Sequence, residues 1–331
     1  MGIPKIEGRA LITGASGFIG GRLRDALADR GADVVAVRRK GSPASKRGRS
    51  VEVDYDDRPG LERVMREEKP DWVLHVAGAT KGVTRDDFFR ANVMPTENLL
   101  ASLREAHPGV KRFVLVSSLA AYGPSTPERH HVETSARRPI ELYGESKLAA
   151  EHAVEATGDA LAWTILRPSG VYGPGDVDYF NLFREIAGGR NVFFGNRDRW
   201  FSAVYVDDFV EASLLAMTHD AARGRGYFVC DGQPITWGRF QAAIVEASGR
   251  RVLTLSLPET LVDIAAVGGE LATKLDGKPR LFNRQKAKMG AQSAWTCDSS
   301  AIRSELGFAS RVEVHEGVRR AFEWYRREKW L

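Results

Sequence analysis

The sequence predicts an α/β protein in which a doubly wound parallel sheet is followed by a smaller C-terminal lobe. Three observations lead to this fold class. Short apolar runs alternate with helical patterns throughout the first half of the chain, as a parallel sheet with crossover helices requires. A glycine-rich turn joins the first apolar run to the first helical segment. After Pro168 the alternation stops, and glycines and aromatic residues replace the strand and helix signals.

Six apolar runs are the expected strands, at residues 10–13, 33–37, 50–53, 72–76, 112–117 and 163–166. Helices are expected between them, near residues 18–30, 59–68, 86–106 and 141–157. Because crossovers between parallel strands are right-handed, this order produces a doubly wound sheet whose ligands bind at the carboxyl ends of the strands. A helix at 206–218 and a strand at 227–230 are expected to return to the sheet.

The composition is that of a soluble protein with a sizeable core. The chain has 331 residues, of which 43% are hydrophobic and 27% charged. Its two cysteines, Cys230 and Cys297, lie far apart and match no metal-ligand spacing, so we expect a cytoplasmic protein without a metal. Residues 1–9 contain no apolar run, and no run approaches about 18 apolar residues, so neither a signal peptide nor a transmembrane helix is expected.

Positive charge gathers in one short segment. The net charge is +5, and six cations with no acidic residue among them lie between residues 38 and 49. A solvated surface is the simplest interpretation of such a cluster. No aromatic residues interleave it, so we expect no nucleic-acid partner.

The glycine-rich turn has the spacing of a dinucleotide site. Gly14 permits a tight turn, Gly17 allows the backbone to approach a pyrophosphate, and Gly20 lets the following helix pack on the sheet. The helix dipole and its free N–H groups then face the phosphates. This predicts a Rossmann domain that binds NAD(P) over residues 1–174, with 203–230 returning to it, and a substrate-binding lobe from 175–202 and 231–331. The cofactor is expected against Gly14, Ser16, Gly17, Phe18, Ile19 and Gly20.

The end of the second strand favours NADP(H) over NAD(H). An NAD-specific site carries an acidic residue there, whereas this chain has Arg38 and Arg39, which suit a 2′-phosphate. No acidic residue lies between positions 38 and 49 to repel that phosphate. NAD(H) stays the alternative cofactor. Asp54 and Tyr55, after the third strand, are expected beside the adenine, although Asp54 could instead only stabilise a turn.

Tyr143 and Lys147 lie four residues apart and therefore on one face of a helix. A phenol with an ordinary pKa of about 10 exchanges protons near neutrality only if its anion is stabilised, and a nearby ammonium provides that. We therefore expect Lys147 to lower the pKa of Tyr143. Tyr325 and Lys329 have the same spacing, but we expect them on the exposed face of a terminal helix.

Ser118 supplies the hydroxyl that such a pair needs. It follows a strand that is expected to end at the ligand-binding edge, where it can donate a hydrogen bond to a substrate oxygen. The alternative is a serine that only caps a turn.

In their order along the chain, these motifs resemble the extended short-chain dehydrogenase/reductase family. The resemblance rests on residues 13–20, 75–79, 92–93, 117–118, 122–123, 143 and 147, 166–168, 171–175 and 206–208. It implies that Ser118, Tyr143 and Lys147 form the catalytic triad, in which Tyr143 moves the proton and Lys147 holds the ribose. It also implies a homodimer through the helices near 86–106 and 141–157. The implied cofactor contacts are Ala77, Gly78, Ala79, Asn92, Ser117, Tyr143, Lys147, Pro168 and Val171.

Within that family the sequence favours one branch. Sugar 4,6-dehydratases carry Asp-Glu after the catalytic hydroxyl, where this chain has Leu119 and Ala120. Many nucleotide-sugar enzymes have an arginine that meets the substrate phosphate, where this chain has Phe201. Residues 231–237, 257–259, 305–308 and 324–325 are similar to the 3β-hydroxysteroid dehydrogenase and dihydroflavonol reductase-like branch.

Seven aromatic residues lie between positions 179 and 201 and suit an apolar ligand, although they could equally form the core of the lobe. The expected substrate contacts are Thr80, Leu119, Ala120, Tyr179, Phe183, Phe194 and Trp200. An amphipathic segment at 257–275 with lysines and arginines behind it permits loose contact with a membrane surface, although a packed helix with a solvated face is the alternative.

We therefore predict an NADP(H)-dependent oxidoreductase that interconverts a secondary alcohol and a ketone on an apolar small molecule, sterol-like, polyketide-like or aromatic. The alternatives are a nucleotide-sugar epimerase with tightly bound NAD(P) and a non-catalytic NADP-binding protein.

Overall fold

A computed structural model describes residues 5–260 and 284–331. Within these residues the main sheet has seven parallel strands in the order β11-β6-β5-β4-β1-β2-β3. This doubly wound sheet confirms the predicted fold class. The strands are β1 Arg9–Thr13, β2 Asp33–Arg38, β3 Arg49–Glu52, β4 Trp72–His75, β5 Arg112–Val116, β6 Trp163–Pro168 and β11 Arg225–Val229.

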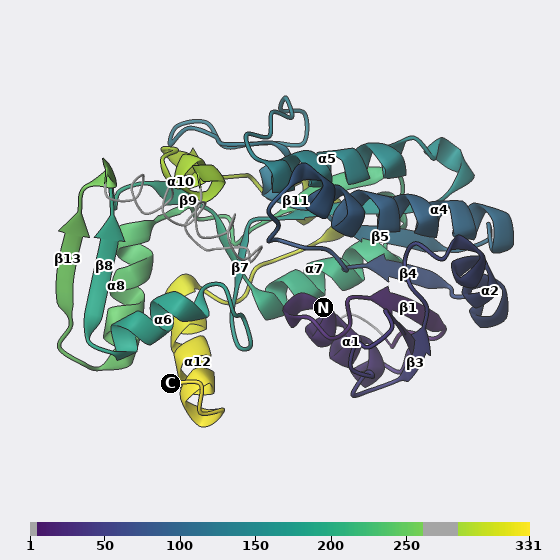
Figure 1. Cartoon of the computed structure of the whole chain (residues 1–331), viewed down its shortest axis with the longest axis horizontal. Helices are drawn as coiled ribbons and strands as arrows, with labels where there is room; N and C mark the ends of the chain where they lie inside the picture. The colour runs from purple at the N-terminus through teal and green to yellow at the C-terminus, as the bar shows by residue number, and fades with distance from the viewer. Residues whose placement is uncertain (1–4, 261–283) are drawn as a thin grey trace.

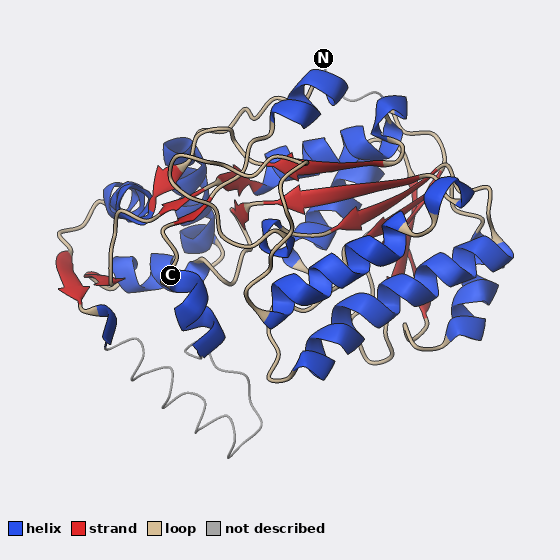
Figure 2. Ribbon diagram, turned by 90° about the horizontal axis from the view of Figure 1, so that it is seen from above, coloured by secondary structure: helices blue, strands red, loops and turns tan. Residues whose placement is uncertain are grey.

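Helices cover both faces of the sheet (Figures 1 and 2). Side chains alternate along each strand, so Ala10 and Ile12 face one helical layer while Leu11 faces the other. The first layer contains α1 Phe18–Asp29, α7 Val206–Thr218 and α11 Ser300–Leu306. The second contains α2 Arg58–Glu68, α4 Met94–Ala106 and α5 Leu142–Glu155. Each fully buried aliphatic side chain in these layers contributes roughly 1.5–3 kcal/mol.

The helix that the sequence predicts near 86–106 is interrupted. A short helix α3 Arg85–Phe88 passes into a π-helical turn at Phe89–Val93 before α4 begins. Pro95 follows closely after this turn, and because it has no N–H the ordinary helical hydrogen bond to the carbonyl of Ala91 cannot form. π-Helical turns occur frequently at functional sites, and this one carries Asn92.

A smaller lobe lies beside the carboxyl edge of the sheet, on the left of Figure 1. It contains α6 Phe180–Ala187, α8 Trp237–Ser248, α10 Arg284–Gly290 and α12 Val314–Arg327. Its strands are β8 Arg190–Phe194 paired with β13 Leu253–Leu257, and β9 Trp200–Phe201 between β12 Ile235–Thr236 and β14 Ala294–Trp295. Strands β7 Gly170–Tyr172 and β10 Ala203–Tyr205 pair where the lobe joins the sheet domain.

Two expectations about aromatic residues need correction. Phe183 was expected in the substrate cleft, but it is only 1% exposed and contacts the rings of Phe322 and Tyr325 in the core of the lobe. Tyr325 was expected at a surface, but the amphipathic helix α12 buries it completely. Its hydroxyl donates to the carbonyl oxygens of Gly173 and Asp176, and Lys329 lies beyond the end of that helix.

No helix in the described part of the chain is both long and apolar enough to cross a bilayer. The amphipathic segment expected at 257–275 lies mostly outside the described residues.

Candidate active site

The glycine-rich turn lies between β1 and α1, and its geometry requires the glycines. Gly14 has a φ of 73°, and a Cβ there would lie 2.8 Å from the amide nitrogen of Ala77. A Cβ on Gly20 would overlap the carbonyl oxygen of Gly14. Gly17 caps α1, no side chain caps the helix, and its first turn has no acidic residue. Ser16 and Gly17 are exposed, and Phe18 and Ile19 are half-buried at the start of the helix. The helix N-terminus therefore fits the pyrophosphate of a dinucleotide.

A buried hydrogen-bonded chain fixes the strand ends beneath this turn. The hydroxyl of Thr13 lies 2.7 Å from Nδ1 of His75 and accepts hydrogen bonds from the amides of Val76 and Ala77. Nε2 of His75 lies 3.0 Å from the hydroxyl of Thr96. Burial, and secondarily the charge of Lys147, lowers the pKa of His75 to about 3, so this imidazole is neutral and serves as a link between β1, β4 and α4. The sequence analysis included Thr13 and His75 in motifs but gave them no role. Each is a polar residue that ends a buried strand, and this position could have indicated a hydrogen-bonding role.

Asn92 braces the loop after β4. Its Oδ1 accepts from the amide of Ala79 at 2.7 Å, and its Nδ2 donates to Ala79 O at 3.1 Å and to the Ser146 hydroxyl at 2.9 Å. Ser146 in turn donates to the carbonyl oxygen of Tyr143. Asn92 is 1% exposed, and its side chain holds the loop 77–79 in place through Ala79. Sequence reasoning missed Ser146, although it lies between Tyr143 and Lys147 on the same helix.

The expected adenosine side carries an acidic residue that the sequence argument did not place there. Parallel pairing of β2 and β3 sets Glu52 opposite Arg38, and their side chains form an ion pair of 2.6 Å. Nη1 of Arg38 also donates to Ser42 O, while its buried Nε has no hydrogen-bond partner in the described structure. Arg39 is exposed. Although no acidic residue lies between positions 38 and 49 of the sequence, the fold therefore places the carboxylate of Glu52 beside Arg38.

Asp54 and Tyr55 follow β3 on the same side of the sheet. Asp54 accepts a hydrogen bond from the amide of Lys40, a contact that fits the alternative of a turn carboxylate. The Tyr55 hydroxyl donates to Val37 O, and burial raises its pKa.

The three residues of the expected triad lie where β5 ends against α5. The Ser118 side chain forms a hydrogen bond with Tyr143 and also accepts from the amide of Ala120. The ammonium of Lys147 donates to Val116 O at 2.7 Å. The carboxylate of Glu141, a residue that sequence reasoning missed, accepts from the amides of Tyr143 and Gly144 and so caps α5. The cap fixes where the helix begins and therefore where the phenol lies.

The ionisation of this group differs from the prediction that Lys147 lowers the pKa of Tyr143. Removal of the hydroxyl from water raises the pKa of Tyr143 to about 12; the hydrogen bond from Ser118 opposes this, and the charges of Glu141 and Asp178 add to it. Burial lowers the pKa of Lys147 to about 8, against the opposing charge of Glu151. Lys147 points to Val116 O, and the phenol therefore keeps its proton at neutral pH. Such a phenol is suited to donating a proton.

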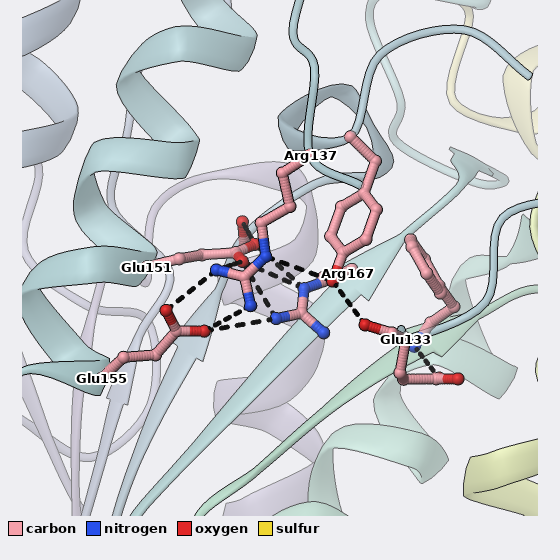
Figure 3. A network of polar contacts seen from close by, with 8 residues as sticks. Glu133, Arg137, Glu151, Glu155 and Arg167 are labelled. Atoms are coloured by element: carbon pink, nitrogen blue, oxygen red, sulfur yellow. Dashed lines mark hydrogen bonds and ion pairs between the residues drawn. The ribbon is translucent and has the colours of Figure 1, made fainter. Parts of the chain in front are cut away.

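Ser117 is buried, and its side chain is hydrogen-bonded to Glu151 of α5. Its hydroxyl donates to Glu151 Oε1 at 2.5 Å, inside a buried ionic cluster with Arg167, Arg137 and Glu155 (Figure 3). The side chain of Ser117 is therefore engaged in this cluster, and its contact with a cofactor stays a prediction. Sequence reasoning missed this cluster, although Glu151 follows Lys147 by four residues and so shares its helix face.

The other expected contacts are distributed around the catalytic group. Leu119 and Ala120 form the short turn after Ser118, and Thr80 is exposed in the loop after β4. Pro168 ends β6, and Val171 lies half-buried in β7.

An ion pair of 2.7 Å between Lys81 and Asp178 joins the loop after β4 to the small lobe. Asp178 is one of the charges that act on Tyr143.

The aromatic residues of the small lobe divide into two groups. Tyr179 stacks against Trp237, which stacks on Phe201 with ring centroids 4.3 Å apart. Trp200 lines a separate pocket of about 550 Å³ with Phe193, Asn191 and Arg239, and no residue of the catalytic group lines that pocket. Phe194 lies in β8, and its side chain is outside the described structure.

Comparison with known proteins relates the chain to one family. The NAD dependent epimerase/dehydratase family matches residues 10–230. A 3-beta-hydroxysteroid dehydrogenase of Mycolicibacterium neoaurum is 30% identical over 291 residues, which cover 81% of this chain and 78% of that protein. A ceramide reductase of Caulobacter vibrioides is 29% identical over 337 residues, covering 98% and 96%. The solved UDP-glucose 4-epimerase of Thermus thermophilus, in complex with NAD, is 26% identical with a TM-score of 0.76, covering 96% and 99%.

Proposed function

The chain belongs to the NAD dependent epimerase/dehydratase family, and on that premise we propose that it is an NADP(H)-dependent oxidoreductase that interconverts a secondary alcohol and a ketone on an apolar substrate. Its relatives make it an NAD(P)-dependent enzyme of the extended short-chain dehydrogenase/reductase type, an oxidoreductase or an epimerase. The substrate class, the roles of individual residues and the preference for NADP(H) are our proposal.

One observation carries the proposal: the hydroxyl of Ser118 is paired with the buried phenol of Tyr143, on the helix that also carries Lys147. Tyr143 would donate its proton to the oxygen of a substrate carbonyl, since burial keeps its pKa near 12 and the proton in place. Ser118, hydrogen-bonded to that phenol, would donate to the same oxygen as negative charge develops there. Lys147 would hold the ribose. When bound, the nicotinamide supplies or accepts the hydride.

Three observations support an apolar substrate. The turn after Ser118 presents Leu119 and Ala120, neither of which can act as an acid or base. Phe201 is buried against Trp237, so no cation at that position meets a substrate phosphate. Two relatives, named as a 3-beta-hydroxysteroid dehydrogenase and a ceramide reductase, act on lipids by their names.

The preference for NADP(H) rests on the cations at the end of β2. Arg39 is exposed, and Arg38 has a buried Nε with no partner in the described structure. A 2′-phosphate would compete with Glu52 for Arg38, because the ion pair already occupies one side of the guanidinium. NAD(H) is the alternative.

The purified protein with NADPH and a panel of ketones tests the proposal. We expect stoichiometric oxidation of NADPH with an apolar ketone and none with nucleotide sugars. The second candidate, an epimerase, is favoured by the likeness to the UDP-glucose 4-epimerase. It predicts the reverse result, conversion of a nucleotide sugar without net consumption of NADPH. A non-catalytic NADP-binding role would be supported if Tyr143→Phe left cellular function unaltered.

We also propose a homodimer through α4 and α5. The two helices lie side by side on one face of the sheet (Figure 1). Analytical ultracentrifugation should give twice the mass of the 36.5 kDa chain, and a monomer at micromolar concentration would contradict this assembly.

A further inference from the structure

Helix α5 carries four ionisable side chains at intervals of four residues, Tyr143, Lys147, Glu151 and Glu155. Residues at this spacing lie in one row along a helix. The first two belong to the proposed active site. Glu151 is fully buried, and no step of the proposed reaction uses it.

Glu151 is held from two other elements of the fold. Arg167 of β6 donates from Nε and Nη2 to the carboxylate at 3.0–3.1 Å, and Nη1 of Arg137 lies 3.5 Å from it. Arg137 and Arg167 also contact Glu155, one helical turn further on (Figure 3). Two guanidinium groups thus pair with one carboxylate inside the protein.

Three side chains of this row contact three successive residues at the end of β5, from Val116 to Ser118. Lys147 donates to Val116 O, Glu151 accepts from the Ser117 hydroxyl, and Tyr143 forms a hydrogen bond with Ser118. Ser117 therefore links the buried cluster to the next residue, Ser118, which carries the proposed catalytic hydroxyl.

We propose that Glu151 is a positioning residue of this active site: through Ser117 it fixes the end of β5 that carries Ser118, and it lies one turn of α5 from Lys147. The inference deepens the proposed function and rests on it for the roles of Ser118 and Lys147.

The charges around Lys147 explain why Glu151 matters. His75 of β4 is neutral, Tyr143 keeps its proton, and burial alone would drive Lys147 toward the neutral amine. Glu151 is the group whose charge opposes that effect. An amine could no longer donate as an ammonium to a ribose hydroxyl, so the affinity for the cofactor should fall as pH rises through the pKa of Lys147.

The test measures the dissociation constant of NADPH by fluorescence as a function of pH. In Glu151→Gln the alkaline loss of affinity should move to lower pH by about one unit or more, because a negative charge one helical turn from Lys147 is removed. Glu151→Asp keeps the charge, so in this variant the alkaline loss of affinity, the alkaline limb of the pH profile, should return to its wild-type position. Arg137→Gln removes an opposing positive charge and should move the limb to higher pH.

Two further variants separate positioning from stability. Ser117→Ala should lower kcat with a ketone by about tenfold, because Ser118 loses its support, and should leave the pH limb unchanged. Glu155→Gln is the matched control: it contacts the same two arginines one turn further from Lys147, so it should lower the melting temperature and leave both kcat and the limb unchanged.

A limb that stays at the wild-type pH in Glu151→Gln, with only the melting temperature lowered, would overturn the proposal. If Glu151→Gln does not fold, Arg137→Gln and Ser117→Ala test the proposal instead. It would be overturned if the alkaline limb stayed in place in Arg137→Gln and kcat stayed the same in Ser117→Ala. Failure to reduce any ketone would count against the proposed function alone, because the binding measurement needs no turnover.

Discussion

The ion pair between Arg38 and Glu52 gives the sharpest prediction about cofactor choice. In Glu52→Gln the side chain keeps its shape and loses its charge, so Arg38 is free to meet a 2′-phosphate and a nearby negative charge is removed. We expect NADPH to bind more tightly and NADH to bind as before, because only NADPH carries the phosphate.

The size of the effect follows from exposure. Two unit charges about 4 Å apart interact by about 4 kcal/mol at an effective dielectric of 20. The side chains of Arg38 and Glu52 are 27% and 42% exposed, so solvent reduces the competition to about 1 kcal/mol. Repulsion between Glu52 and the phosphate adds a similar small amount. Together they amount to about 2 kcal/mol and predict roughly a thirtyfold tighter binding of NADPH.

Fluorescence titration of both cofactors into wild type and Glu52→Gln measures this directly, at two salt concentrations to reveal the electrostatic part. Arg38→Asp is the opposite perturbation and should reverse the preference. Equal changes for NADPH and NADH in Glu52→Gln, or no change in either, would refute the placement of the phosphate beside Arg38.

Three further outcomes follow from the structure. Gly20→Ala should abolish tight binding of both cofactors while the protein remains folded by circular dichroism, since its Cβ would overlap Gly14 O; unchanged affinity would contradict the role given to the turn. Phe183→Ala should lower the free energy of unfolding in urea by about 3–5 kcal/mol without changing KM for a ketone, and a changed KM with little loss of stability would return Phe183 to the substrate cleft. The affinity of the wild-type protein for NADPH should decline as pH rises through about 8, where Lys147 loses its proton, and a flat profile to pH 10 would exclude Lys147 as the group that holds the ribose.

The sequence was sufficient for the parts of the fold that local patterns encode. Every predicted strand of the sheet lies within one or two residues of its observed bounds. The strands inside the sheet read as apolar runs because both of their faces are covered, whereas the edge strand β3 is largely exposed. The glycine-rich turn was equally readable, since Gly14 needs a positive φ and Gly20 admits no side chain.

Contacts between distant segments were not readable in this way. Glu52 meets Arg38 because of the register of β2 and β3, and residue spacing does not give that register. Phe183 and Tyr325 are buried because two helices of the small lobe face each other. The pKa of Tyr143 depends on Asp178, which the fold brings from the other lobe.

The measurement that tests the central claim most directly compares wild type with Tyr143→Phe, using NADPH and an apolar ketone. We predict that wild type oxidises NADPH in proportion to the alcohol formed, and that the variant binds NADPH equally well but turns over at least about a hundredfold more slowly, because the proton donor is gone. Undiminished turnover in the variant, or NADPH consumption by neither protein, would contradict the account.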